Sequence, residues 1–226
     1  LYEVVRSIYV PNPILKLDSK MSVERIREMV LGYEEASRFG AILNFDPDRD
    51  IHEAVEIVKA LPFGFSILID SQMEQSKRVD IAGNLQPDSI LKLDPGIGVQ
   101  YAQEIAAALS PGCFLQLDPK IDVEVAKSIA KSLKPGSILK LDPEIDVEGA
   151  QEIAAVLGPK VILGLSKFLR GAGALCKEMY LENAKLVTSS LKPKSILWLD
   201  PGLEEGLAVE IASQIGKDVL LKLDPY

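Results

Sequence analysis

The sequence predicts an α/β fold in the form of a right-handed βα solenoid, with a parallel sheet on the concave face and helices on the convex face. Two observations carry this prediction. A 24-residue period runs from Asp46 to Ser166, and each period holds a strand-like pattern followed by a helix-like one. A fixed period of about 20 to 50 residues is typical of solenoids, in which each unit buries its apolar side against its neighbours.

The repeat is clearest in three consecutive copies. They occupy residues 89–112, 113–136 and 137–160, and they read SILKLDPGIGVQYAQEIAAALSPG, CFLQLDPKIDVEVAKSIAKSLKPG and SILKLDPEIDVEGAQEIAAVLGPK. The Asp that ends each short apolar run serves as the anchor of its unit. The anchors, with Ser once in place of Asp, are Asp18, Asp46, Asp70, Asp94, Asp118, Asp142, Ser166, Asp200 and Asp224.

The spacing of the anchors sets the expected domain organisation. Most intervals are 24 residues, the first is 28, and the interval from Ser166 to Asp200 is 34. We therefore expect one solenoid of about nine units over residues 13–226, with an insertion near residues 167–178. Residues 1–12 fit no unit and are expected to be a flank or the end of an upstream segment. Because no initiator Met is present, we expect an excised fragment.

Each unit is expected to hold one strand and one helix. Leu91 and Leu93 are apolar at period 2, which is typical of a strand. The stretch 102–109 then places Ala, Ile, Ala and Leu at the i, i+3, i+4, i+7 spacing of one helix face. Asp122 and Asp146 stand where a carboxylate caps a helix, and Pro-Gly pairs follow the helical stretches and end them. Strands joined by helical crossovers must run parallel.

The Asp residues at the strand ends are expected to form turns. Adjacent parallel strands lie about 4.8 Å apart, and two carboxylates at such a distance repel by about 1 kcal/mol even in water. Ser166 keeps the ability to accept a hydrogen bond from the turn but loses the charge, which favours a turn role over a functional carboxylate row. We assign this turn role to Asp46, Asp70, Asp94, Asp118, Asp142 and Asp200, and we expect no catalytic residue, metal or cofactor.

One strand position varies from unit to unit while the rest of the repeat stays uniform. It reads Lys16, Asn44, Leu68, Lys92, Gln116, Lys140, Gly164, Trp198 and Lys222, and its side chains are expected on the open face of the sheet. Uniform positions serve stacking, so the variable ones are free to serve recognition. The alternative for the lysines is that they offset the charge of the Asp row. The expected partner-binding residues are Trp198, Phe114, Leu68, Lys92, Gln116, Lys140, Asn44 and Lys222.

Trp198 is the sharpest of these candidates because it is the only Trp in the chain. An exposed Trp on a rigid sheet is a common anchor at protein interfaces; the alternative is that Trp198 packs under the inserted loop.

The neighbouring row is almost entirely apolar and includes Phe114. This row is expected to form a hydrophobic stripe for a partner, unless other parts of the protein cover it. Its members are Ile14, Ile42, Ser66, Ile90, Phe114, Ile138, Ile162, Ile196 and Leu220.

Composition limits which class of partner and which cellular compartment we expect. The net charge of −8 would repel a phosphate backbone, so we expect a protein partner carrying a basic patch and no nucleic acid. No apolar run reaches the roughly 18 residues that a membrane span needs, so no membrane is expected. Two cysteines make no disulfide framework, which indicates either a reducing compartment or indifference to redox, and we expect a cytoplasmic location. Cys113 opens a strand and is expected in the core.

The units resemble leucine-rich repeats of the ribonuclease-inhibitor type over about residues 14–226. The matching residues are Leu139, Leu141, Ile145, Gly149, Ala150, Ile153, Ala154 and Leu157. The family's unit is longer, and its strand is followed by an Asn where Asp-Pro stands here. The resemblance implies a horseshoe-shaped module that binds proteins on its concave face, as an inhibitor for example, and that is no enzyme. A looser likeness to the repeats of bacterial effectors implies a targeting segment for virulence in the host cytosol.

Two other readings stay open. An eight-stranded α/β barrel carries catalytic residues at the carboxyl ends of its strands, where the Asp row stands. Nine strand starts overfill such a barrel, and polar residues such as Lys92 and Lys140 poorly fill its interior. A structural spacer in a longer protein is the third possibility.

Overall fold

The computed structural model describes residues 14–36, 42–61, 65–118, 121–141, 145–165, 175–199 and 204–222. Strands and helices alternate along the chain. The strands are β1 (Ile14–Leu17), β2 (Ile42–Phe45), β3 (Ser66–Ile69), β4 (Ile90–Leu93), β5 (Phe114–Gln116), β6 (Ile138–Leu141), β7 (Ile162–Leu165), β8 (Ile196–Leu199) and β9 (Leu220–Lys222). The helices are α2 (Val23–Ala36), α3 (Ile51–Ala60), α4 (Gln75–Gly83), α5 (Val99–Ala108), α6 (Val123–Ser132), α7 (Val147–Ala154), α8 (Leu175–Ser189) and α9 (Glu205–Ala212).

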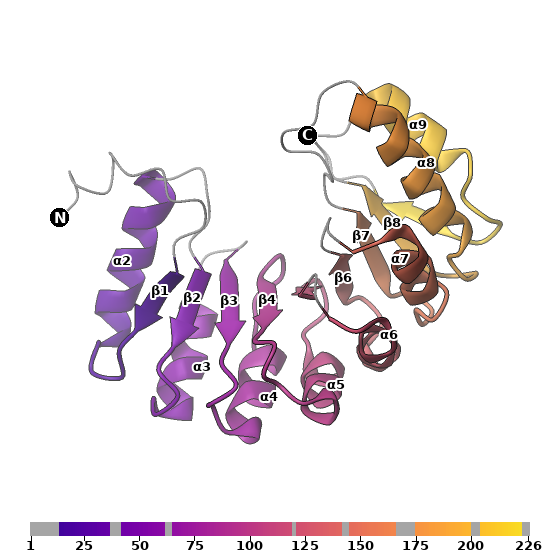
Figure 1. Ribbon diagram of the computed structural model, residues 1–226. Coiled ribbons are helices and arrows are strands. Elements are labelled where there is room, and N and C mark those ends of the chain that lie inside the picture. Colours follow the sequence, from indigo (N-terminus) through magenta and orange to yellow (C-terminus); the bar gives the residue numbers. More distant parts are fainter. Residues whose placement is uncertain are drawn as a thin grey trace.

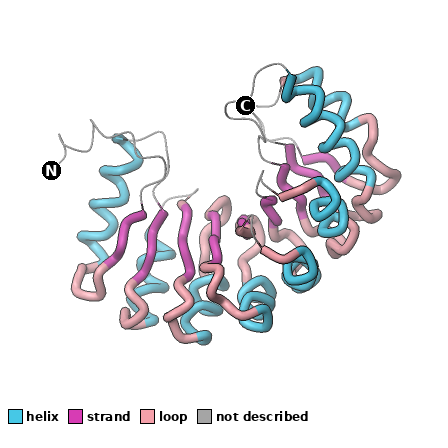
Figure 2. Tube along the Cα trace, viewed as in Figure 1, coloured by secondary structure: helices cyan, strands magenta, loops and turns pink. Residues whose placement is uncertain are grey.

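The strands form one nine-stranded sheet in the order β1 to β9, and each strand pairs in parallel with the next one in sequence. The predicted α/β class and the parallel sheet are confirmed. Figure 1 shows the units following one another along an arc, with the strands on its inner side and the helices on its outer side. The tube view makes the separation into an inner strand layer and an outer helix layer plain (Figure 2). Within the described residues, no helix is both long and apolar enough to cross a membrane.

In the described residues, each strand from β1 to β5 leads into a tight turn at its anchor Asp. In the β4 unit, the N–H of Ile97 donates to the carbonyl oxygen of Asp94 at 3.0 Å, which closes a four-residue turn. The N–H of Gly96 donates to the Asp94 carboxylate at 2.7 Å. Pro95 stands at the second turn position, where its fixed φ suits the turn. The side chain and the ring together stop the strand and direct the chain toward the next helix.

The helices begin where the capping residues predict. The Asp122 side chain accepts from the N–H groups of Glu124 and Val125, and Asp146 accepts from Gly149. These bonds satisfy amide groups that have no partner inside the helix. The predicted N-caps are therefore confirmed at α6 and α7.

A second type of turn follows each helix from α4 to α9 and demands a left-handed backbone. Gly112 and Gly136 have φ of 81° and 88°, and Asp88, Lys160, Lys194 and Asp218 take φ of 63° to 69° at the equivalent position. These turns also bond to one another along the arc. The N–H of Gly112 donates to the carbonyl oxygen of Gly136 at 2.7 Å, and the N–H of Gly136 to that of Lys160 at 2.8 Å. This second ladder ties consecutive units together at the edge opposite the Asp turns.

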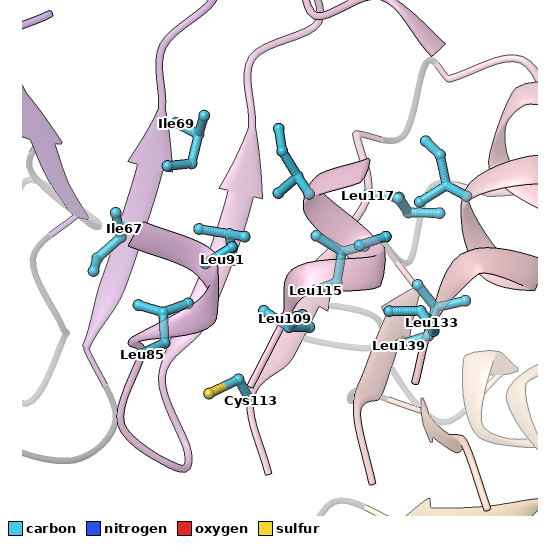
Figure 3. Packing of buried hydrophobic residues seen from close by; sticks show 14 of the residues in the cluster. Ile67, Ile69, Leu85, Leu91, Leu109, Cys113, Leu115, Leu117, Leu133 and Leu139 are labelled. Carbon is cyan, nitrogen blue, oxygen red and sulfur yellow. The ribbon is translucent and has the colours of Figure 1, made fainter. Parts of the chain in front are cut away.

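The main core lies between the sheet and the helices. The second and fourth residues of most strands meet the Ala, Ile and Leu face of the helices there, and Figure 3 shows Leu91, Leu115 and Leu139 stacked in consecutive units. Cys113 is fully buried in this core, as predicted. Its thiol donates a hydrogen bond to the carbonyl oxygen of Gln86, with 3.0 Å between the two atoms.

Candidate functional site

The inner face of the sheet carries the variable row in strict register. Lys16 pairs with Asn44, Asn44 with Leu68, and the pairing continues through each strand to Trp198 and Lys222. The predicted partner-binding residues Asn44, Leu68, Lys92, Gln116, Lys140, Trp198 and Lys222 therefore lie side by side in one row. Phe114 lies two residues before Gln116, on the same face and in the neighbouring row.

The row is only partly open to solvent. Lys16 is exposed, whereas Asn44, Leu68, Lys92, Gln116, Lys140, Trp198 and Lys222 are half-buried. Lys92, Gln116, Lys140, Trp198 and Lys222 each already interact with other groups of the protein. A partner would therefore meet side chains that are ordered by their neighbours rather than free ones.

The apolar row is not the continuous exposed stripe that the sequence suggests. Phe114, Ile138 and Ile162 are buried in a second apolar cluster, and Ile90, Ile196 and Trp198 pack against it. Ile138 is 0% exposed and Phe114 9%. Only the two ends of the row stand open, with Ile14 at 55% and Leu220 at 59%. The expectation of an exposed Phe114 is wrong, because side chains of the same face fold over the centre of the row.

Trp198 packs against this second cluster and is itself only partly buried. Its ring meets the ring of Phe114 edge to face, with 5.4 Å between the centroids and 69° between the planes. Gly164 pairs directly with Trp198 in the adjacent strand. A Cβ at Gly164 would lie 3.3 Å from Cε3 of Trp198 and 3.5 Å from Cγ2 of Ile138, so the indole occupies the room that a side chain would need. The inserted loop that was expected above Trp198 falls mostly in residues 166–174, outside the described residues.

The Asp row lies at the carboxyl ends of the strands. The carboxylates of Asp18, Asp46, Asp70 and Asp94 each accept a hydrogen bond from the backbone N–H two residues further on. Asp118 closes its turn through its carbonyl oxygen, which accepts from the N–H of Ile121. Asp142 and Asp200 lie outside the described residues.

Asp46 also binds the preceding turn. Its Oδ2 accepts from the N–H of Ser19 at 3.1 Å. The N–H groups of Asp48 and then Ser19, followed by the Ser19 hydroxyl and the charge of Arg49, hold the pKa of Asp46 below its ordinary value. In the described part of the chain, no group of three or more His, Cys, Asp or Glu side chains lies close enough to hold a metal ion.

Sequence reasoning passed over Gly164 and Ile138, on which the second cluster depends. A signal was present, because a Gly inside a strand often marks close approach by another group. Gly164 directly precedes Trp198 in the variable row, so the smallest and the largest residue of that row occupy adjacent strands.

Comparison with known proteins finds matches among solved structures only. No protein-family model and no curated protein matches the chain. Among solved structures, it is similar to a racemase from Streptomyces coelicolor A3(2) with bound magnesium, at 11% identity and a TM-score of 0.42, over 99% of this chain and 56% of that one. It is also similar to a mandelate racemase/muconate lactonizing enzyme from Bordetella bronchiseptica RB50, at 16% identity and a TM-score of 0.36, over 91% and 58%. The chain thus spans little more than half the length of either structure.

These comparisons correct several expectations. The matched structures are racemase-type enzymes and not leucine-rich repeat proteins, so the family resemblance drawn from the repeat is withdrawn. The expectation that the chain is no enzyme is corrected as well, because both matched structures are enzymes. The links to bacterial effectors, virulence and a cytoplasmic or host-cytosol location have no support. With both TM-scores below 0.5, the two likenesses carry no argument about what this chain does.

Proposed function

We propose that residues 13–226 form an open βα solenoid of about nine units, and that the inner face of its sheet binds a partner protein. One observation carries the proposal: a single register-matched row of unlike side chains runs the length of a uniform sheet. Parallel strands hold such side chains at a fixed spacing of about 4.8 Å. A rigid array of this kind suits recognition of an extended protein surface.

Pairing at the ends of the sheet supports an open arc rather than a closed barrel. Among the described strands, β1 pairs only with β2, and β9 pairs only with β8. A barrel would join its first and last strands. The exposure of Ile14 and Leu220, which occupy the same row at the two ends of the sheet, agrees with unjoined ends.

The contacts are assigned to the half-buried members of the variable row, namely Asn44, Leu68, Lys92, Gln116, Lys140 and Lys222. Trp198 and Phe114 contribute mainly by shaping the face, since Phe114 is buried and the Trp198 ring packs over Gly164. The net charge of −8 and the Asp carboxylates beside the row favour a partner surface that carries basic groups.

A capture experiment with matched variants tests this assignment. The triple variant Lys92→Ala/Gln116→Ala/Lys140→Ala alters the inner face, and Lys131→Ala/Lys134→Ala/Gln100→Ala makes the same exchanges at exposed positions around the outer helices. Each tagged protein is incubated with lysate of the source organism, and the captured protein is then purified and titrated. We expect the inner-face variant alone to lose affinity while it stays folded at the assay temperature. Equal affinity for both variants, or failure of any purified protein to bind, contradicts the proposal.

An α/β-barrel enzyme with Asp residues at the carboxyl ends of its strands is the alternative function. The parallel sheet supports it, because active sites of such barrels lie at this end of the strands. The turn bonds of Asp18, Asp46, Asp70 and Asp94 weigh against it, because each carboxylate accepts from its own turn. A distance between β1 and β9 that matches neighbouring strands would favour this alternative.

A further inference from the structure

We propose that Trp198, which packs over Gly164 and against Phe114, fixes the curvature of the sheet from β5 to β8. We call these three residues the clamp. This inference goes beyond the proposed function, because it concerns the shape of the free protein and needs no partner. Trp198 is then a positioning residue for the inner face rather than a contact residue.

The distances show how far the two rings lean toward each other. Phe114 lies in β5 and Trp198 in β8, so three strand spacings, or about 14 Å, separate their backbones in a flat sheet. The ring centroids are 5.4 Å apart. Side chains on the inside of a bend converge, and large rings close the remaining gap. The aromatic contact is therefore available only while the sheet stays bent.

The residues under the rings make this reach possible. In β7 the variable row holds Gly164, so the indole lies over the backbone without hindrance. Ile138 of β6 is fully buried within the second cluster, and Ile162 of β7 is buried with it. The clamp thus spans β5, β6, β7 and β8 with an apolar contact at every strand. Figure 1 shows the arc turning through β5 and β6, so that β7 and β8 stand at an angle to β1–β4.

Loss of the clamp should relax the bend, because edge-to-face aromatic packing stabilises the bent form only. The main variant is Trp198→Leu, which keeps an apolar side chain but cannot reach Phe114. A milder variant, Gly164→Ala, places a methyl group where the indole lies and pushes the ring outward without removing it. Ser66→Leu is the matched control, because it enlarges a residue on the same inner face in β3, far along the sheet from β7.

Two measurements on the free chain test the clamp. Small-angle scattering should show a larger radius of gyration for Trp198→Leu than for the parent or for Ser66→Leu. In Gly164→Ala, emission of the sole Trp should shift to longer wavelength and acrylamide quenching should increase, while Ser66→Leu leaves both unchanged. If Trp198→Leu fails to fold, Gly164→Ala provides the scattering test as well.

A double-mutant cycle separates a clamp from two independent contacts. The losses in unfolding free energy for Phe114→Leu and Trp198→Leu should sum to more than the loss in the double variant, because each single change already breaks the shared contact. Additive losses, or a scattering curve that Trp198→Leu does not alter, would overturn the clamp. Neither result would bear on whether the inner face binds a partner.

Discussion

The guanidinium of Arg49 donates a hydrogen bond to the carbonyl oxygen of Asp18, in the turn of the preceding unit. The same Nη2 atom donates to the carbonyl oxygen of Met21 at 2.9 Å, and Nη1 pairs with Glu53 at 2.9 Å. Arg49 is 2% exposed and is the largest fully buried side chain among the described residues. Arg49 lies three residues after its anchor Asp, and in other units this position is apolar. The equivalent residues are Met21, Met73, Ile97, Ile121 and Ile145.

Substitution of Arg49 tests whether it stabilises by its bonds or by its volume. Arg49→Ala leaves two turn carbonyl oxygens without this donor and opens a void, so we expect a loss of roughly 3 kcal/mol in the free energy of unfolding. Arg49→Met restores the apolar side chain that other units hold at this position and should lose clearly less. Urea unfolding of both variants measures the difference. Equal losses would mean that the filled volume contributes little.

The buried hydroxyl of Ser137 is expected to oppose folding. Ser137 is 0% exposed, and its Oγ has no hydrogen-bond partner within the described residues. Val161 holds the equivalent position in the next unit. Ser137→Val should therefore raise the free energy of unfolding by about 1 kcal/mol or leave it unchanged. Thermal unfolding of Ser137→Val and Ser137→Ala checks this; a fall of more than about 1 kcal/mol in the Val variant would contradict it.

Substitutions at two equivalent turn positions should change the free energy of unfolding in opposite directions. Gly136 has φ of 88°, and an added Cβ would lie 3.2 Å from Cβ of Pro111. Gly136→Ala should lower the free energy of unfolding by roughly 1 to 2 kcal/mol. Lys160 is strained at φ of 63° in the same place, so Lys160→Gly should be neutral or stabilising by a few tenths of a kcal/mol. Destabilisation of similar size in both variants would refute the shared backbone conformation.

Cys113 should make stability fall at high pH. Burial, and then the charge of Asp88, raise the pKa of the thiol from an ordinary value of 9.0 to about 12. The unfolded thiol ionises first, so its contribution to stability is complete below about pH 9 and is lost between pH 9 and 12. Urea unfolding at pH 8 and pH 10.5 should show a larger drop in a Cys176→Ala background than in Cys113→Ser/Cys176→Ala. An equal drop in both proteins would place the titration elsewhere.

The lowered pKa of Asp46 predicts that the protein loses stability in acid. The pKa of Asp46 is lowered chiefly by the N–H groups of Asp48 and Ser19, so its contribution is present above the ordinary value of 3.8 and is lost as the pH falls through the folded value. Asp46→Ala should lose stability at pH 7 and show a shallower acid transition. Asp46→Ser, which copies Ser166, should retain more stability than Asp46→Ala. No difference between the Ala and Ser variants would argue against the turn role.

The regular parts of the fold follow from the sequence because they depend on local patterns. The period 2 of Leu91 and Leu93, the helix face from Ala102 and the caps Asp122 and Asp146 each act within a few residues of their own position. Repetition then fixes which strand pairs with which, because equivalent residues must stack. The register of the variable row could be predicted for this reason.

The exceptions to the repeat could not be predicted in this way. Arg78 replaces the Ala found at positions 102, 126 and 150, yet it is buried and donates to the carbonyl oxygen of Ser71 at 2.6 Å. Trp198 covers Gly164 and reaches Phe114 three strands away, and that contact depends on how strongly the sheet bends. Both cases depend on distances across units, which a pattern along one chain does not contain.

The distance between β1 and β9 tests the open solenoid most directly. Spin labels at Lys16→Cys and Lys222→Cys, in a Cys113→Ser/Cys176→Ser background, would report this distance by pulsed electron resonance. Eight strand gaps separate the two sites, so the path along the sheet is about 38 Å, and we predict a distance shortened by curvature but far beyond one strand spacing. A distance that matches labels on neighbouring strands, about 5 Å apart at the backbone, would mean that the sheet closes on itself and would contradict the account.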